Sequence, residues 1–89
     1  MQVEALTPNI AEELNLPAGT RGVVITRIDP GSPALDSGLQ PGDVIQEVNQ
    51  KSVINLDQFQ TAIRNAGKQP VLLLINRNGR TSYIVISPR

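Results

Sequence analysis

Glycine and proline divide this chain of 89 residues into short segments, since it holds seven of each. Proline fixes its own φ angle and glycine tolerates positive φ, so both mark turns and element ends. Pro30-Gly31, Pro41-Gly42 and Asn78-Gly79 are turn signals of this kind. The segments between them leave room only for short strands and short helices.

Three segments carry helix signals that begin with a capping residue. Thr7, Ser32 and Asn55 each precede a helical stretch, and proline follows the first two at the first helical position. After Asn55, apolar residues recur on one helical face, and Gln58 is placed to complete a capping box. We expect helices that begin at residue 8 and end in the stretch 16–19, that run from 33 to Gly38, and that run from 56 to 66.

Runs rich in Val and Ile predict strands between the turns. The predicted strands are residues 1–6, 22–29, 43–49, 52–54, 71–77 and 80–87, and Asn78-Gly79 predicts a type I′ hairpin between the last two. The element order predicts a mixed α/β (α+β) fold: a partly open antiparallel β-barrel or sandwich of five to six strands, capped by two to three helices. We expect residues 1–89 to form a single domain.

The residue types that most catalytic and metal sites need are missing. The chain has no Cys and no His, which excludes thiolate or His-ligated zinc and His-dependent nucleophilic catalysis. None of its serines lies in a Gly-x-Ser-x-Gly elbow. A serine–lysine dyad with Lys51 or Lys68 as the base is disfavoured, because no catalytic motif accompanies either lysine. The carboxylates are scattered, and Asp43 is interpreted as a turn or strand-start residue. We predict a non-catalytic binding domain without metal or cofactor.

Charge and aromatic content exclude further classes of partner. Eight Lys and Arg balance eight Asp and Glu, and the only aromatic residues are Phe59 and Tyr83. Nucleic-acid binders normally show a basic excess or stacking aromatics, so we predict no nucleic-acid partner. The longest apolar run, residues 71–75, is too short to cross a bilayer, which predicts no membrane insertion. The start of the chain has no signal-peptide pattern.

The middle of the chain resembles the central stretch of PDZ domains. The resemblance is carried by Ile28-Asp29-Pro30-Gly31-Ser32-Pro33-Ala34, by Ser37-Gly38-Leu39-Gln40-Pro41-Gly42-Asp43-Val44-Ile45, and by Val48-Asn49. The predicted strand 80–87 comes last, which resembles the circularly permuted PDZ domains of bacterial exported proteases. The stretch from Leu6-Thr7-Pro8 to Val23-Val24 is similar to PDZ domains of Do-like (HtrA) serine proteases, and the chain's ending is most similar to their second, C-terminal PDZ. Site-2 metalloproteases and C-terminal processing proteases carry similar modules and are alternative parents.

This resemblance implies a peptide-binding site between one sheet edge and one helix. A peptide C-terminus would add as an antiparallel strand. The implied site residues are Met1, Gln2, Val3, Glu4 and Ala5 on the first strand, and Leu56, Gln60 and Ile63 on the long helix. Leu56 occupies the position of the His of the Ser/Thr-selecting class, which implies tolerance of apolar residues two positions before the peptide terminus. Core packing is the alternative interpretation of Ile63 and Leu56, and Gln60 alone is uninformative.

The family's carboxylate-holding loop should lie immediately before the first strand. Met1 falls where the last apolar residue of that loop would be, so we expect the loop upstream of Met1 or an incomplete site. Arg21-Gly22-Val23 has the same residue pattern but precedes the wrong strand, and we interpret it as a structural turn.

By resemblance, the function is recognition of C-terminal peptides or unfolded apolar segments for a linked serine endopeptidase of protein quality control. The parent would be periplasmic or extracytoplasmic. The alternative is an assembly module that contacts other domains or neighbouring protomers of the protease oligomer without capturing peptide. Peptide hydrolysis by this chain alone is disfavoured, because it lacks His, Cys and any nucleophile motif.

Overall fold

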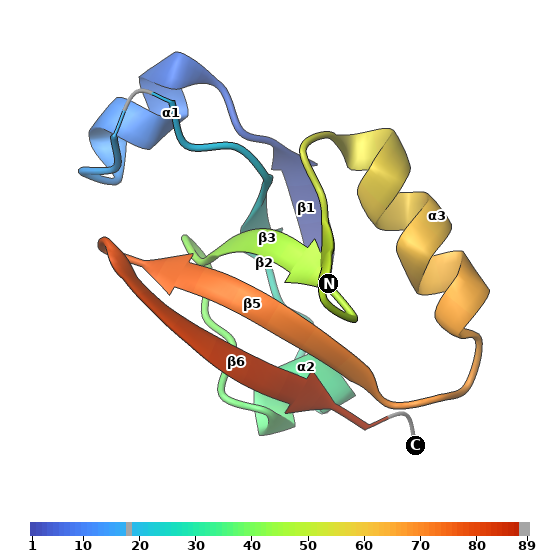
Figure 1. Ribbon diagram of the computed structural model, residues 1–89. Helices are drawn as coiled ribbons and strands as arrows, with labels where there is room; N and C mark the ends of the chain where they lie inside the picture. The colour runs from blue at the N-terminus through green and yellow to red at the C-terminus, as the bar shows by residue number, and fades with distance from the viewer. Residues whose placement is uncertain (18, 88–89) are drawn as a thin grey trace.

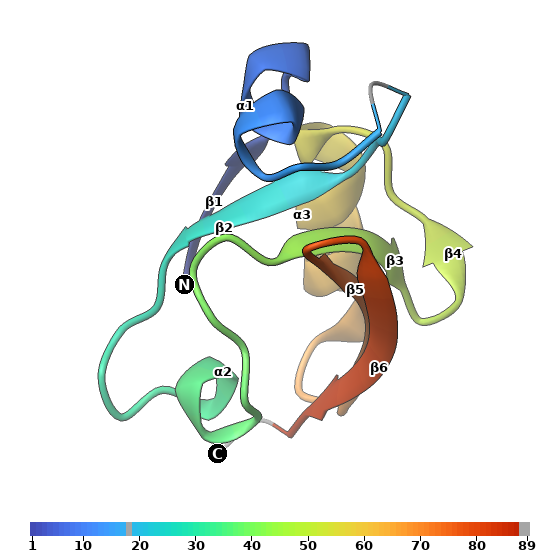
Figure 2. The same cartoon turned by 90° about the vertical axis from the view of Figure 1, so that its left-hand side faces the viewer.

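Six antiparallel strands form one open sheet in the computed structural model, which describes residues 1–17 and 19–87. The strands are β1 (Gln2–Ala5), β2 (Val23–Arg27), β3 (Val44–Val48), β4 (Lys51–Ser52), β5 (Val71–Arg77) and β6 (Arg80–Ile86). Their order across the sheet is β1-β2-β3-β5-β6, and β4 pairs with β3 beside this path. The sheet bends, so that β2 and β6 run in very different directions (Figure 2).

Three helices accompany the sheet: α1 (Pro8–Glu13), α2 (Pro33–Asp36) and α3 (Leu56–Ala66) (Figure 1). The three predicted caps are present. The side chains of Thr7, Ser32 and Asn55 accept from backbone N–H groups of the first helical turn, at 3.2, 3.4 and 2.8 Å. The six antiparallel strands and three helices confirm the predicted fold class. The caps show that the helix starts could be predicted from local signals alone.

The end of α1 was predicted too late. The helix stops at Glu13 rather than in the stretch 16–19, of which Ala18 lies outside the described residues. Asn15 adopts a positive φ of 58°, and the N–H of Leu16 donates to the carbonyl oxygen of Ala11 at 2.8 Å. This is a Schellman ending in which asparagine replaces glycine, and it places Leu16 in a buried position.

The short strand β4 also differs from its prediction, since it spans Lys51–Ser52 instead of 52–54. Asn49 and Gln50 both have positive φ and form the turn before it. Asn49 exchanges two hydrogen bonds with Leu72 of β5: its N–H donates to the Leu72 carbonyl at 2.7 Å, and its Oδ1 accepts from the Leu72 N–H at 2.9 Å. These hydrogen bonds fix the turn to β5. Strand β4 therefore begins at Lys51, earlier than the β-propensity of the sequence indicates.

The capping box of α3 is altered in one contact. Gln58 Oε1 accepts from the N–H of Ile54 at 2.9 Å, one residue before the N-cap that a standard capping box would satisfy. The hairpin of β5 and β6 follows its prediction, because Asn78 and Gly79 have φ angles of 55° and 88° and Arg77 pairs with Arg80.

Two apolar clusters lie on opposite faces of β2. Val23 and Ile25 belong to the larger cluster, which also contains Phe59 of α3. Val24 belongs to the smaller cluster beneath α1. Successive strand residues point to opposite faces, so three consecutive buried residues require cover on both sides. Strand β2 is thus packed against apolar side chains on both faces, and β1 pairs with this buried strand.

An ion pair between the buried Asp43 and the partly exposed Arg77 ties the end of β5 to the loop before β3. Asp43 is 1% exposed, and its carboxylate accepts from Arg77 Nε and Nη2, both at 2.8 Å, and from the N–H of Gln40 at 2.9 Å. Arg77 Nη2 also donates to the carbonyl of Gly38 at 3.0 Å. The hydrogen bond to Asp43 raises the pKa of Arg77 above its ordinary value. Asp43 is thus more than the turn residue that the sequence indicated.

Removing this carboxylate should destabilise the fold. Asp43→Ala leaves the Gln40 N–H and the guanidinium without their acceptor, and we expect a loss of about 2–3 kcal/mol in the free energy of unfolding, below the full cost of a broken buried pair because Arg77 still reaches water. Arg77→Lys keeps the charge but loses the bidentate geometry, and it should cost about 1 kcal/mol, the net value of one hydrogen bond. Urea denaturation measures both, and an Asp43→Ala change below about 0.5 kcal/mol would show that the pair contributes little.

Candidate functional site

Strand β1 is paired on only one edge. It lies at the end of the sheet and pairs with β2, and no other described strand pairs with it. The N–H of Leu6 donates to the carbonyl of Gly22 at 3.3 Å. The N–H of Ile25 donates to the backbone carbonyl of Asp43, just before β3, at 2.8 Å, and therefore points away from β1. Backbone groups alternate along an antiparallel strand, so Glu4, opposite Val24, bonds to β2, while Val3 and Ala5 direct their N–H and C=O groups to the open edge.

The side chains of β1 alternate between the core and solvent. Met1 and Val3 are half-buried and pack against the larger apolar cluster. Gln2 and Glu4 are exposed, and so is Ala5 despite its place on the inner face. A β-bulge between Gln2 and Val3 shifts the register at the start of the strand.

Helix α3 lies in contact with β1 and runs in the opposite direction (Figure 1). Phe59 is buried beneath the helix. Leu56 and Ile63 are half-buried and pack against the same cluster as Met1 and Val3, whereas Gln60 is exposed. The structure therefore places seven of the eight predicted residues on the adjacent elements β1 and α3, and Met1 immediately before β1. We call them the β1–α3 surface: Met1, Gln2, Val3, Glu4, Ala5, Leu56, Gln60 and Ile63.

The opposite flank of α3 carries a cavity that the sequence analysis missed. Its volume is about 430 Å³, and it lies between α3 and the β3–β4 hairpin. Its lining includes Val48, Lys51 and Val53 on the sheet side and Asp57, Thr61 and Asn65 on the helix. The short or polar residues on this side of α3, such as Thr61 and Asn65, were the only signal in the sequence, and they are equally typical of an exposed helix face.

Gly22 holds β2 and β3 close together. Its φ is +146°, and a Cβ at this position would collide with the carbonyl oxygen of Ile45. Gly22 lies beside Leu6, just beyond the Ala5 end of β1, whereas a carboxylate-holding loop would precede Met1 at the other end. These positions agree with the interpretation of Arg21-Gly22-Val23 as a structural turn.

Residues 1–17 and 19–87 hold no group of three or more His, Cys, Asp or Glu placed to bind a metal ion. No helix within these ranges has the length and apolar character needed to span a bilayer.

A substitution at Gly22 tests the close approach of β2 and β3. We expect Gly22→Ala to destabilise the domain by about 3 kcal/mol or more, because the added methyl must displace the β3 backbone on top of the cost of the positive φ. Gly38→Ala is the matched control, since Gly38 also has positive φ (94°) but nothing within 4 Å of its Cβ position. Thermal unfolding of the two variants compares them, and equal losses would refute the steric role of Gly22.

The PDZ domain family model matches residues 24–77, more than half of the chain. Among curated proteins, the chain is 31% identical over 86 residues to a probable periplasmic serine endoprotease DegP-like of Chlamydia trachomatis, covering 97% of this chain and 17% of that protein. It is 33% identical over 89 residues to the mitochondrial serine protease HTRA2 of Drosophila erecta, covering 93% of this chain and 21% of that protein. The chain thus spans about a fifth of the length of these relatives.

Two solved structures are similar over nearly the whole chain. One is the HtrA3 PDZ domain bound to the phage-derived ligand FGRWV, with a TM-score of 0.83 and 26% identity, covering 100% of this chain and 81% of that one. The other is the HtrA-type protease AlgW with a decapeptide, with a TM-score of 0.83 and 30% identity, covering 97% of this chain and 26% of that one.

Proposed function

This chain belongs to the PDZ domain family, and we propose that it captures peptides by strand addition at the β1–α3 surface. The observation that carries this proposal is the unpaired edge of β1, which lies in contact with α3. A peptide on that edge gains hydrogen bonds from the Val3 and Ala5 backbone and apolar contact from the helix.

Six of the eight residues of the β1–α3 surface are assigned a role in this proposal. The backbones of Val3 and Ala5 pair with the peptide, and Met1, Leu56 and Ile63 contact its inward-facing side chains. Gln60 lies at the exposed rim of the helix. With Leu56 in place of His, the site favours an apolar residue two positions before the peptide terminus. The related HtrA3 domain was crystallised with a ligand that ends in valine, which supports an apolar terminus here.

We further propose that residues 1–89 form one non-catalytic PDZ module of an HtrA-type serine endoprotease, most similar to a second PDZ. The module would deliver C-terminal peptides or unfolded segments to the protease domain. The relatives include proteins named as periplasmic and as mitochondrial serine proteases. The resemblance to the permuted PDZ domains of bacterial exported proteases supports a periplasmic or extracytoplasmic location of the parent.

A second candidate function is contact with other domains of the parent oligomer. It is motivated by β6, which ends the sheet and exposes Tyr83 and Val85 by 57% and 53%. This function would be supported if the chain captures the protease domain, if Tyr83→Ala abolishes the capture, and if saturating peptide leaves it intact. Failure to capture it would refute this function and leave peptide binding unaffected.

Peptide capture is tested by comparing the two flanks of α3. We expect a peptide ending in Val, Leu or Phe to shift the backbone amide signals of Val3, Glu4 and Ile63. Ile63→Ala removes three carbons from the β1–α3 surface, and it should weaken binding about five- to tenfold, because each buried CH₂ contributes about 0.8 kcal/mol and the ligand covers only part of the side chain.

The matched control is Thr61→Ala, which changes the cavity on the other flank of α3. It should leave the dissociation constant within about twofold, a difference of about 0.4 kcal/mol. Weaker binding by Thr61→Ala with Ile63→Ala unaffected would move the site to the cavity. The absence of any amide shift in a folded chain would refute peptide capture.

A further inference from the structure

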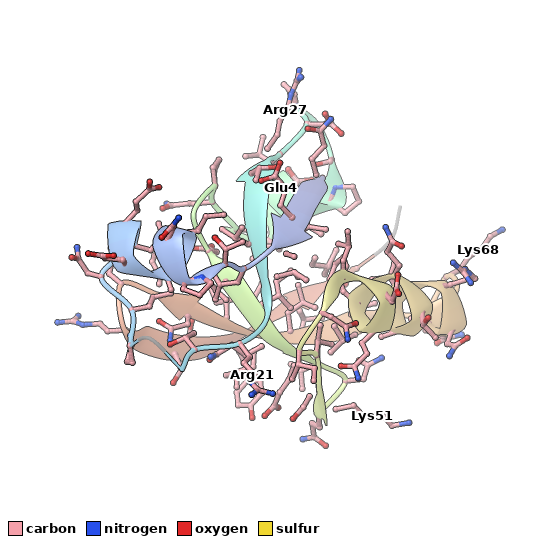
Figure 3. All side chains as sticks on the ribbon, turned by 90° about the horizontal axis from the view of Figure 1, so that it is seen from above. Glu4, Arg21, Arg27, Lys51 and Lys68 are labelled. Atoms are coloured by element: carbon pink, nitrogen blue, oxygen red, sulfur yellow. The ribbon has the colours of Figure 1, made fainter. Side chains whose placement is uncertain are left out.

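Glu4 is the only charged side chain on β1. It is exposed, and it lies on the face of the strand opposite to the one from which Val3 packs into the core. Figure 3 shows Glu4 by β1, which lies at one end of the strand order and pairs with no described strand other than β2. A charge at this position stands directly beside the path that an added strand would take.

The carboxylate of Glu4 has no partner among residues 1–17 and 19–87. The ion pairs in this part of the chain join the Met1 ammonium to Asp29 and Arg77 to Asp43. The residue opposite Glu4 on β2 is the buried Val24. Arg27, which pairs with Gln2 instead, extends outward at the edge of Figure 3. The charge of Glu4 is therefore not neutralised from within the fold.

The register of an antiparallel peptide on β1 decides which of its residues meets Glu4. With the last residue of the peptide opposite Met1, the residue two positions before it exchanges hydrogen bonds with Val3, whose backbone groups face the open edge. The residue three positions before the terminus then lies opposite Glu4 in a non-hydrogen-bonded pair. In such pairs the side chains share one face, with Cβ atoms about 4.5–5.5 Å apart.

We propose that Glu4 selects a lysine or arginine three positions before the terminus of the bound peptide. This inference rests on the proposed function and adds the ligand class to it. The ligand has an apolar last residue, an apolar residue two positions before the last, and a basic residue three positions before the last. The apolar positions face α3 and the basic position faces solvent, because side chains alternate along a strand.

The effect of Glu4 should be moderate and sensitive to salt. Opposite charges on directly opposed strand residues change affinity by about two- to fivefold, and exposed pairs are screened as ionic strength rises. Moving the basic residue to two positions before the terminus should abolish the preference, because that side chain faces α3 on the other side of the peptide.

The experiment uses three peptides that differ only at the third position before the terminus, with Lys, Ala or Glu there. Dissociation constants are measured at low salt for the unmodified chain, Glu4→Lys and Glu13→Lys. Glu13 is exposed on α1, so its variant makes the same change in net charge away from the β1–α3 surface. We expect affinity to fall from Lys to Ala to Glu, by about two- to fivefold at each step, in the unmodified chain and in Glu13→Lys. The order should reverse in Glu4→Lys.

The outcomes separate this inference from the proposed function. Equal affinity for the three peptides would overturn the role of Glu4 while peptide capture stands. A change of order in Glu13→Lys as large as in Glu4→Lys would also overturn it, since overall charge would then explain the preference. No binding of any of the three by a folded chain would refute peptide capture itself, and the inference with it.

Discussion

Strand β1 hydrogen-bonds to β2 along one edge and leaves its other edge without a partner strand among the described residues. An unpaired edge is normally a liability, because its N–H and C=O groups pair with any extended chain that fits. Here the edge is only four residues long and lies in contact with α3, which restricts what fits. Because side chains and backbone groups alternate along β1, Val3 and Ala5 present backbone hydrogen-bonding groups at the open edge. The inner face of the strand presents apolar side chains, and Glu4 presents a charge on the outer face.

The rest of the fold holds that edge in place. β2 is packed on both faces, with Val24 beneath α1 and Val23 and Ile25 against the core that Phe59 of α3 completes. Gly22 lets β2 approach β3 closely, and the Asp43–Arg77 pair fixes the loop before β3 to β5. None of these contacts touches the proposed peptide, yet each restrains the strand pairing on which the position of β1 depends.

Local signals allowed most of the fold to be predicted, and long-range contacts account for what was missed. The caps at Thr7, Ser32 and Asn55 and the Asn78-Gly79 hairpin act within a few residues, so the sequence reveals them directly. The Asp43–Arg77 pair joins residues 34 positions apart, and the Asn49 contact that shifts β4 crosses to Leu72, so neither has a local pattern. The pairing of β1 with α3 came from the family resemblance rather than from periodicity, and the cavity on the other flank of α3 had no distinctive signal.

Hydrogen exchange of the β1 amides tests the central claim most directly. In the chain without ligand, the Val3 and Ala5 N–H groups face the open edge, while the Glu4 N–H is bonded to β2. A bound peptide that ends in an apolar residue should slow exchange at Val3 and Ala5 and change Glu4 far less, because only the first two gain a partner. Binding that slows exchange along β6, or beside the cavity of α3, with Val3 and Ala5 unchanged would contradict strand addition at β1.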